Sequence, residues 1–428
     1  MSLRRPTLGR NVLALTAVSF FTDVSSEMIY PLLPVFLTVT LGASAGMLGT
    51  IEGAAETTAS LLKLASGWWS DRVKRRKPLI VAGYAIASLV RPLIAMAQSA
   101  TQVLAIRITD RVGKGIRNAP RDALIADSVD PSIRGRAFGF HKAGDHAGAF
   151  LGPLIAFGML TWVGTTVRTV FWFAAIPGAL AVLTAVLLVR EGVMRRPFGP
   201  DSQYPVAKGS ESSGPAETTE AYRESAAQSA AAQNALQQAA TQDAMPRQFW
   251  GYIAVFLLFT LGSSSDAFLL LRANQLGVPI ALMPILWAAL HAVKSLASTP
   301  GGALSDRVGR VPTLLAGWTL YALVYVGFAF ASAAWHAWAL FVAYGLFFAL
   351  TEGAERALVA DIVPAARRGT AFGWFNLTTG LGLLPASVAF GLVWDQWGAS
   401  SAFLMGSAIA ASASIALVLL PKPRSLPG

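Results

Sequence analysis

The feature that most limits how this chain can fold is a series of apolar segments, each close to the length of about 20 residues that a helix needs to cross a bilayer. Only 13% of the 428 residues are charged and 54% are hydrophobic, whereas soluble domains carry about twice that charged fraction. The segments occupy residues 12–38, 46–69, 78–97, 101–122, 137–161, 168–189, 249–271, 280–304, 312–331, 336–360, 371–394 and 400–420. The sequence therefore predicts an all-α integral membrane protein with twelve transmembrane helices.

Basic residues outnumber acidic ones by 34 to 23, which gives a formal net charge of +11. They gather in alternate loops, with Arg72, Lys74, Arg75, Arg76 and Lys77 in one, Arg134 and Arg136 in a second, Arg307 and Arg310 in a third, and Arg367 and Arg368 in a fourth. By the positive-inside rule we expect these loops and both termini to be cytoplasmic, in the inner membrane of a bacterium. This distribution favours lipid over nucleic acid as the charged partner.

Residues 191–247 interrupt the apolar pattern with Pro, Ser, Glu, Gln and Ala, a composition that cannot bury a core. We expect a flexible cytoplasmic linker there, between an N-terminal bundle of residues 1–190 and a C-terminal bundle of residues 248–428. A repeat supports this division, because Ser70-Asp71-Arg72-Val73 recurs as Ser305-Asp306-Arg307-Val308 and Ala123-Leu124-Ile125-Ala126-Asp127 recurs as Ala357-Leu358-Val359-Ala360-Asp361, at offsets of 235 and 234. Such duplication predicts two pseudo-symmetric six-helix bundles with a substrate site between them.

The run from Gly67 to Lys77, GWWSDRVKRRK, resembles the loop signature G-x-x-x-D-R-x-G-R-R-x of the major facilitator superfamily, and the run from Gly302 to Arg310 is a degenerate second copy. In that family the Asp caps a neighbouring helix and pairs with basic groups, which latches the cytoplasmic gate. The resemblance assigns this role to Asp71, Arg72, Arg75 and Arg76, with Asp306, Arg307 and Arg310 as the repeat.

Two further runs resemble signatures of the same superfamily. The run from Arg111 to Gly115, RVGKG, is similar to the R-x-x-Q-G signature of the fourth helix. The run from Gly148 to Pro153, GAFLGP, is similar to the G-x-x-x-G-P signature of the fifth helix in many proton antiporters. The resemblance covers the whole chain. It implies the major facilitator fold and transport by alternating access, and it leaves the substrate open.

Residues 107–121 place a large amount of charge inside an apolar segment. On a helix, the side chains within an arc of about 120° are those of Arg107, Asp110, Arg111, Lys114, Arg117 and Arg121. Cations at membrane depth are costly unless they face a partner, a cavity or a ligand. We therefore propose Arg111, Lys114 and Arg107 as contacts of an anionic or zwitterionic substrate. The alternative is a solvated helix face, which the flanking apolar segments disfavour.

Carboxylates on three other helices could meet these cations. Asp23 and Glu27 lie on the first helix, Glu52 and Glu56 on the second, and Asp145 on the fifth. A carboxylate opposite a cation suits a proton carrier, because its proton affinity depends on whether that cation is engaged. Asp23 is the first candidate, followed by Glu56 and Asp145, with Glu27 nearer the outer mouth. The alternative is an ion-pair network that only holds the N-terminal half together.

Three more candidate substrate contacts come from the aromatic and C-terminal parts of the chain. Tyr30 shares a face with the carboxylates of the first helix, and Trp287 and Lys294 fall on one side of the eighth. At helical spacing most aromatic residues are packing or interface residues. Arg91 on the third helix is expected to extend to the membrane interface.

The chain has no cysteine, no ligand cluster with metal-site spacing and no phosphate-binding loop of the Walker type. We expect no metal or cofactor, no enzymatic activity and an ion gradient as the energy source.

The leading hypothesis is a monomeric, proton-coupled secondary active transporter of a small polar organic solute, anionic or zwitterionic. The second is a proton/drug antiporter that exports lipophilic compounds, favoured by the run from Gly148 to Pro153. The third is a receptor or scaffold that acts through residues 191–247.

Overall fold

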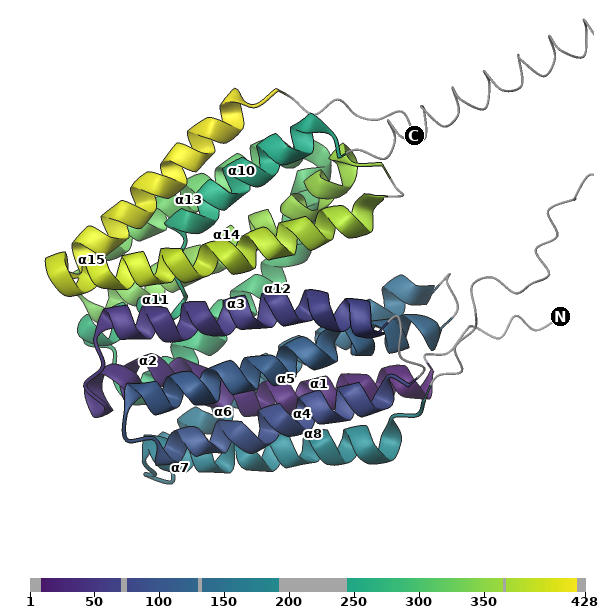
Figure 1. The fold of residues 1–428 in the computed structure, drawn as a ribbon. Coiled ribbons are helices and arrows are strands. Elements are labelled where there is room, and N and C mark those ends of the chain that lie inside the picture. The colour runs from purple at the N-terminus through teal and green to yellow at the C-terminus, as the bar shows by residue number, and fades with distance from the viewer. Residues whose placement is uncertain (1–8, 71–74, 130–132, 192–244, 365–366, 422–428) are drawn as a thin grey trace, which may run out of the picture.

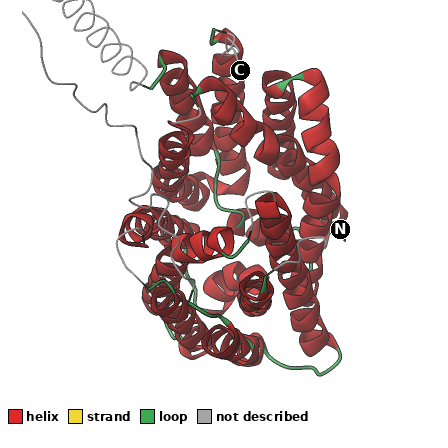
Figure 2. Cartoon of the chain, turned by 90° about the vertical axis from the view of Figure 1, so that its right-hand side faces the viewer, coloured by secondary structure: helices red, strands yellow, loops and turns green. Residues whose placement is uncertain are grey.

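The computed structural model describes residues 9–70, 75–129, 133–191, 245–364 and 367–421 (Figure 1). Within these ranges the chain forms helices joined by short connections and contains no strand, as Figure 2 shows. The expectation of an all-α protein is therefore confirmed for the part of the chain that the structure describes.

The N-terminal part contains α1 (Arg10–Ile29), extended by η1 (Tyr30–Leu32), α2 (Leu33–Val35) and η2 (Phe36–Thr40), then α3 (Ala45–Ser70), α4 (Lys77–Val90) with η3 (Arg91–Met96), α5 (Ala100–Asp127), α6 (Arg134–Thr161), α7 (Val167–Phe173) and α8 (Ala175–Leu188). Proline explains two changes of helix type. Pro31 follows the end of α1 and Pro92 follows the end of α4. A proline ring without an N–H group cannot complete the α-helical hydrogen bonds there.

The C-terminal part contains α10 (Arg247–Gly262), α11 (Ala267–Gln275), η5 (Ile280–Leu282), α12 (Met283–Val308), α13 (Arg310–Phe330), α14 (Ala334–Ile362) and α15 (Arg368–Leu419). α15 is two helices in sequence, because Gly398 has a φ of 84° and a ψ of 168° inside it. Glycine tolerates this positive φ, which residues with a side chain rarely adopt. The break falls between the predicted segments 371–394 and 400–420.

The predicted segment 249–271 is not one continuous helix, because the chain leaves helical geometry between α10 and α11. Tyrosines hydrogen-bond to polar side chains at this break. The hydroxyl groups of Ser264 and Tyr325 are 2.9 Å apart, and Tyr344 donates to Oδ1 of Asp266 at 2.6 Å. These partners come from α13 and α14, so an apolar run alone does not reveal the break.

Eight helical stretches of the described residues, some of them interrupted by a break or kink, are long and apolar enough to cross a membrane. They are Arg10–Thr40, Lys77–Met96, Val167–Leu188, Arg247–Gln275, Ile280–Val308, Arg310–Phe330, Ala334–Ile362 and Thr370–Leu419. Their length and composition match the requirement for spanning helices. The chain is therefore a multi-pass membrane protein.

The helices pack in two groups, with α1 to α8 below α10, α13, α14 and α15 in the view of Figure 1, and with α11 and α12 at about the height of α3. In the N-terminal group α1 packs against α6 and α8, and α5 packs against α3 and α4. In the C-terminal group α13 packs against α14 and α15, α10 against α15, and α12 against α14. The groups meet where α3 packs against α15 and α6 packs against α12. A site between the groups would therefore be bordered by these four helices.

Glycines allow α3 and α15 to approach backbone to backbone. A Cβ atom at Gly49 would lie 2.1 Å from the carbonyl oxygen of Ser387, and one at Gly391 would lie 2.4 Å from that of Ala45. Small residues permit such close helix contacts within a membrane. Neither glycine can be replaced by a larger residue without moving the two helices apart.

An ion pair recurs at equivalent places in the two groups. Arg76 pairs with Asp127, and Nε of Arg310 lies 3.3 Å from Oδ2 of Asp361. Each pair joins residues 51 positions apart, and the pairs are offset by 234 positions, as are the repeated runs that end at Asp127 and Asp361. The duplicated segments therefore make the same tertiary contact.

Candidate functional site

Two glycines hold α5, the helix with the cationic face, close to its neighbours. A Cβ atom at Gly113 would lie 2.6 Å from the carbonyl oxygen of Gly83 on α4. One at Gly115 would lie 2.4 Å from Cβ of Leu62 on α3. The glycines on either side of Lys114 therefore let α5 pack closely between α3 and α4. The charged side chains of α5 are thereby brought near the side chains of these two helices.

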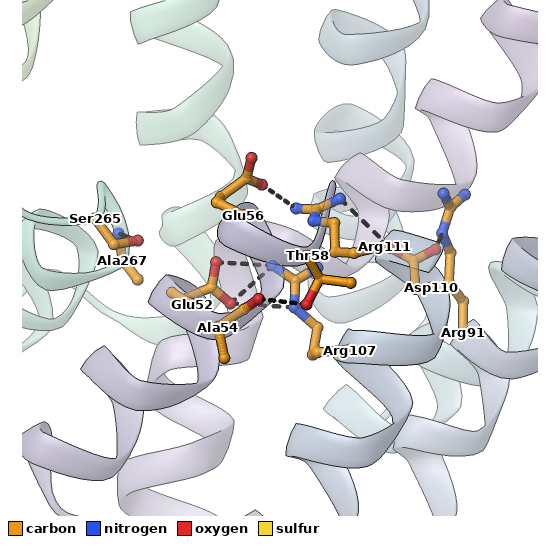
Figure 3. Close-up of polar contacts among 10 residues, drawn as sticks. All are labelled: Glu52, Ala54, Glu56, Thr58, Arg91, Arg107, Asp110, Arg111, Ser265 and Ala267. Carbon is orange, nitrogen blue, oxygen red and sulfur yellow. Dashed lines mark hydrogen bonds and ion pairs between the residues drawn. The ribbon is translucent and has the colours of Figure 1, made fainter. Parts of the chain in front are cut away.

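Arg107 makes three hydrogen bonds to the carboxylate of Glu52, at 3.1 Å from Nε and at 2.8 and 2.7 Å from Nη2 (Figure 3). Arg107 is 7% exposed and Glu52 is 2% exposed. A buried ion pair is stable only when such hydrogen bonds replace the lost hydration. Arg107, a predicted substrate contact, is therefore engaged in an internal pair with Glu52.

Arg111 bridges two carboxylates from different helices (Figure 3). Its Nη2 lies 2.9 Å from Oε1 of Glu56, and its Nη1 lies 3.4 Å from Oδ2 of Asp110. The other oxygen of Asp110 accepts the Nε–H of Arg91 at 2.7 Å. A chain of alternating charge thus runs from α3 through α5 to η3.

Arg91 does not extend to the membrane interface, so that expectation is wrong. Its side chain is buried, with 4% of the residue exposed. The reason is that two acceptors meet it in the interior. Asp110 neutralises its charge, and the carbonyl oxygen of Thr22 on α1 accepts its Nη1–H at 3.0 Å.

Lys114 and Arg117 differ from the other cations of α5, because neither makes an ion pair or hydrogen bond with any residue that the structure describes. The guanidinium carbon of Arg117 lies 4.3 Å from the ring centroid of Tyr84. Nε and Nη1 of Arg117 are buried without a hydrogen-bond partner among the described residues. Arg117 is 5% exposed and Lys114 is half-buried. Two interior cations therefore have no carboxylate bonded to them in the described ranges.

Arg121, one turn beyond Arg117, joins a small polar cluster. Its Nε donates to Oδ1 of Asp122 at 2.9 Å, and its Nη1 donates to Oγ of Ser19 at 3.3 Å. Ser19 also lies 3.2 Å from the hydroxyl of Tyr84 and 3.4 Å from Nε2 of His141. This cluster joins α1, α4, α5 and α6.

Asp23 projects from α1 and is half-buried. Its carboxylate makes no hydrogen bond or ion pair with a residue in the described ranges. Ser19, one turn earlier on α1, lies 3.2 Å from the hydroxyl of Tyr84, and the guanidinium of Arg117 lies over the ring of that tyrosine. The unpaired carboxylate and the two unpaired cations therefore belong to one region, where α1 and α5 are in contact.

Two glycines of the run from Gly148 to Pro153 hold α6 against the carboxylate face of α1. A Cβ atom at Gly148 would lie 3.1 Å from Cβ of Asp23, and one at Gly152 would lie 3.1 Å from Cβ of Glu27. Both would also meet carbonyl oxygens of α1, at 2.4 and 2.6 Å. The spacing of these glycines thus allows α6 to pack closely on α1 beside two candidate proton carriers.

Asp145 has partners on its own helix. Its Oδ2 lies 3.3 Å from Nζ of Lys142, and its Oδ1 lies 3.7 Å from Nε2 of His141. Lys142 is exposed, so solvent screens this pair. Asp145 is therefore weakly engaged, whereas Asp23 has no such partner among the described residues.

Glu27, Tyr30 and Trp287 come together from the two groups of helices. Oε2 of Glu27 accepts the Nε1–H of Trp287 at 2.7 Å, and the rings of Tyr30 and Trp287 have centroids 4.9 Å apart. The guanidinium of Arg107 lies over the ring of Tyr30, with its central carbon 5.8 Å from the ring centroid. Lys294, two turns along α12 from Trp287, instead places Nζ 3.6 Å from the ring centroid of Phe348.

This arrangement can attract an anion and exchange a proton. The cations without a partner can bind a negative group, and Asp23 can gain or lose a proton without breaking an ion pair in the described structure. Among the residues that the structure describes, no group of three or more His, Cys, Asp or Glu side chains could hold a metal ion.

Comparison with known proteins identifies the family. A family model described as Major Facilitator Superfamily matches residues 15–293 and 252–428. The chain belongs to the major facilitator superfamily. An uncharacterized MFS-type transporter of Methanocaldococcus jannaschii is 30% identical over 423 residues, which cover 96% of this chain and 95% of that protein. The solved structure of the nucleoside transporter NupG matches with a TM-score of 0.74 over 96% of this chain and 100% of that one, and its 14% identity supports the fold alone.

Two shorter matches extend the range of relatives of this MFS transporter. A protein of Cupriavidus pinatubonensis named as a probable 4-methylmuconolactone transporter is 35% identical over 167 residues, 37% of this chain and 36% of that protein. The multidrug resistance protein MdtH of Edwardsiella ictaluri is 27% identical over 177 residues, 39% of this chain and 44% of that protein. Two of these three relatives are thus named as transporters and the third as a multidrug resistance protein.

The cytoplasmic latch assigned by resemblance to other MFS transporters is only partly described. Asp71 and Arg72 lie outside the described residues, and Arg75 is exposed. Arg76 pairs with Asp127 of its own helix group. A latch between the two groups at this place therefore stays a prediction.

The second copy of the latch also pairs within its own group. Arg310 pairs with both Asp306 and Asp361, and Arg307 is exposed. These contacts tie the start of α13 to the ends of α12 and α14. They place no latch residue of the C-terminal copy against α3 or α6.

One residue that joins the two groups of the MFS transporter was not identified from the sequence. Asp395 accepts the backbone N–H groups of Ala45 and Gly46, at 2.8 and 2.7 Å. It lies in α15, just before the break at Gly398. An isolated acidic residue between two apolar segments is a weak signal for such a role. Nothing in the sequence links it to the start of α3, 350 positions away.

Proposed function

We propose that this MFS transporter is a proton-coupled secondary active transporter of a small polar organic solute, anionic or zwitterionic. The observation that carries the proposal is the division between paired and unpaired charge on α5. Arg107 and Arg111 are balanced by carboxylates, whereas Lys114 and Arg117 have none bonded to them in the described ranges. Interior cations are costly without a partner. A negative group of a solute would supply the charge that they lack.

Asp23 supports the proton-coupling part of the proposal. Glu56 is held by Arg111, Glu27 accepts a hydrogen bond from a tryptophan, and Asp145 has partners on its own helix. A carboxylate without such partners changes its protonation state without breaking an ion pair. Asp23 is therefore the first choice for the proton carrier, with Glu56, Asp145 and Glu27 behind it.

The architecture we expect has twelve spans in two six-helix bundles, residues 1–190 and 248–428, joined by the cytoplasmic linker 191–247. Eight helices have the length and composition of spans, the more polar α3, α5 and α6 pack among them, and the break at Gly398 divides α15 into two. The basic loops favour cytoplasmic termini and an inner-membrane location in a bacterium. We expect the carrier to act as a monomer.

A proton/drug antiporter is the second candidate. The run from Gly148 to Pro153, which resembles a signature of proton antiporters, favours this candidate. Its glycines Gly148 and Gly152 pack closely beside Asp23 and Glu27. The partial match to a multidrug resistance protein points the same way. The unpaired cations argue against lipophilic cations as substrates, because like charges repel at short range in a medium of low dielectric constant.

Purified protein in liposomes distinguishes the two candidates. With the interior alkaline, radiolabelled lactate and benzoate should accumulate faster than in liposomes without the protein, which measure passive entry of the neutral acids. A protonophore should abolish the difference. Ethidium, a lipophilic cation, should be neither transported nor inhibitory. Transport of ethidium driven by the proton gradient, without transport of either carboxylate, would replace the first candidate by the second.

A further inference from the structure

The cations of α5 fall into two classes that differ in their partners. Arg107 and Arg111 donate to three carboxylates, those of Glu52, Glu56 and Asp110. Lys114 and Arg117 have no bonded partner among the described residues. They are three positions apart, so their side chains are neighbours on the same face of the helix. The second class therefore forms a positively charged site of its own.

Arg117 is held in place by packing and not by a counter-charge. Its guanidinium lies over the ring of Tyr84, which is itself fully buried. Gly83 leaves the space for it, because a Cβ atom there would lie 2.6 Å from Cβ of Arg117. Two of its nitrogen atoms remain buried without a hydrogen-bond partner in the described structure. A buried donor without an acceptor is unfavourable, so the position calls for an acceptor that arrives with a ligand.

Asp23 is the carboxylate that shares this region. It lies one turn along α1 from Ser19, whose hydroxyl is 3.2 Å from that of Tyr84, the residue over whose ring Arg117 lies, and it is bonded to neither cation in the described structure. With Asp23 ionised, the three groups carry one net positive charge. If Asp23 takes up a proton and a singly charged anion binds to the cations, the net charge of the region is the same.

We infer that Lys114 and Arg117 bind the carboxylate of a monocarboxylate solute, and that Asp23 is protonated while the solute is bound. This inference rests on the proposed function and assigns its substrate class. The proton and the solute then move through the carrier in the same direction, which makes the transport a symport. In the protonation step, a hydronium ion of the aqueous phase gives one proton to a carboxylate oxygen of Asp23 and becomes water, and no other covalent bond changes.

The other charged groups on the helices around Asp23 differ in how firmly they are paired. On α1, Glu27 accepts a hydrogen bond from Trp287 of α12. On α6, Asp145 lies beside Lys142 and His141. α5 contributes Lys114 and Arg117 and, a turn away on either side, Arg111 and Arg121, which are paired with Glu56 and Asp122. α12 also carries His291 and Lys294, and α8, which packs on α1, carries no charged residue.

Linkage makes the two binding events reciprocal. If the solute binds better when Asp23 is protonated, the bound solute increases the proton affinity of Asp23 by the same factor. Lower pH should therefore tighten solute binding to the wild type. The carrier in which Asp23 is replaced by Asn should bind the solute with little dependence on pH.

Isothermal titration of purified protein at constant ionic strength tests the site, with lactate and benzoate as probes. Wild type should bind at least one of them, more tightly at about pH 5.5 than at about pH 8. Arg117→Gln and Lys114→Gln should each weaken binding by about tenfold or more. Arg356→Gln, which removes an exposed cation of α14, should bind as wild type does. Equal binding by all four proteins, or tighter binding of inorganic phosphate than of either probe, would overturn the inference. So would the failure of both probes to bind.

A thermal melt of the empty carrier shows whether Arg117 has a structural partner instead. Removal of a charge with no partner should leave the melting temperature of Arg117→Gln at or above that of wild type. A loss comparable to that from breaking a buried ion pair would contradict the assignment. If this variant does not fold, Arg117→Lys and Lys114→Gln still test the site through their affinities.

Proton uptake on binding tests the role of Asp23. When benzoate or lactate is added to wild type in weak buffer, the solution should lose up to one proton per carrier that binds. Asp23→Asn should bind the same probe with little proton uptake. Equal uptake by both proteins would remove Asp23 from the mechanism.

Transport assays separate failure of this inference from failure of the proposed function. If the pH-driven accumulation of a monocarboxylate persists in Arg117→Gln and Lys114→Gln, the site is wrong and the proposed function stands. If wild type binds the probe with proton uptake but liposomes never accumulate it, the site stands and the proposed function is wrong.

Discussion

Asp395 caps α3 at Gly46, because its Oδ2 accepts the backbone N–H of Gly46 at 2.7 Å while its Oδ1 accepts that of Ala45 at 2.8 Å. The start of a helix has unpaired N–H groups and a partial positive charge, so a carboxylate there is favourable. Here the cap comes from the other group of helices. The contact must break before α3 and α15 separate at this end, which is the outer end in the proposed topology.

We expect Asp395→Ala to favour the state that is open to the outside. A hydrogen bond to a charged group contributes about 1.5 kcal/mol or more, so loss of this cap should shift the population by about tenfold or more. The chain has no cysteine, so Ser387→Cys adds a single thiol, at the residue whose carbonyl oxygen faces Gly49 in the α3–α15 contact. Its labelling by a water-soluble maleimide should accelerate when Asp395 is replaced. Glu352→Ala, which removes an exposed carboxylate of α14, is the control, and equal labelling in both backgrounds would show that the cap does not act as a latch.

Glu52→Gln should destabilise the protein strongly, because it leaves Arg107 buried without a balancing charge. The expected loss is about 3 to 5 kcal/mol. Replacement of Arg107 by Met in the same protein should recover much of it. Thermal unfolding in detergent measures both variants. A double variant no more stable than Glu52→Gln would mean that the two residues are not coupled.

Gly148→Ala should weaken the packing of α6 on α1. The added Cβ would lie 2.4 Å from the carbonyl oxygen of Phe20, and overpacking of this kind costs about 1 to 3 kcal/mol. Gly139→Ala on the same helix is the matched control, because a Cβ there meets no atom within 4 Å. A helical Ala is favoured over Gly, so the control should be neutral or stabilising. Equal melting temperatures for the two variants would contradict the close contact.

Asp23→Asn should abolish accumulation driven by a pH gradient but retain exchange of solute across the membrane. Exchange returns a loaded carrier and needs no net change of protonation. Counterflow and pH-driven uptake of the same radiolabelled carboxylate in liposomes measure the two activities. Glu56→Gln is the comparison, because it breaks the pair with Arg111 and should also lower stability. If Asp23→Asn still accumulates solute in response to a pH difference, another group carries the proton.

Local patterns in the sequence are sufficient to predict much of the fold. Spans of about 20 apolar residues predict membrane helices without reference to any partner. The duplicated runs ending at Asp127 and Asp361 predict a repeated unit, and the matching ion pairs of Arg76 and Arg310 follow from the same offset. Periodicity also places the cations of α5 on one face.

The sequence by itself determined the class of protein, its superfamily signatures and the helix faces on which the charges lie, because these depend on neighbouring residues. Only the tertiary structure decided which charges are neutralised. Arg107 and Glu52 are 55 positions apart, and Asp395 and Ala45 are 350 apart. Such pairs depend on how packed helices are rotated about their axes and where glycines let them touch. The same packing leaves Lys114, Arg117 and Asp23 without bonded partners in the described structure. Helical periodicity cannot tell paired from unpaired charges, because every charged residue on one face of a helix fits the same periodic pattern.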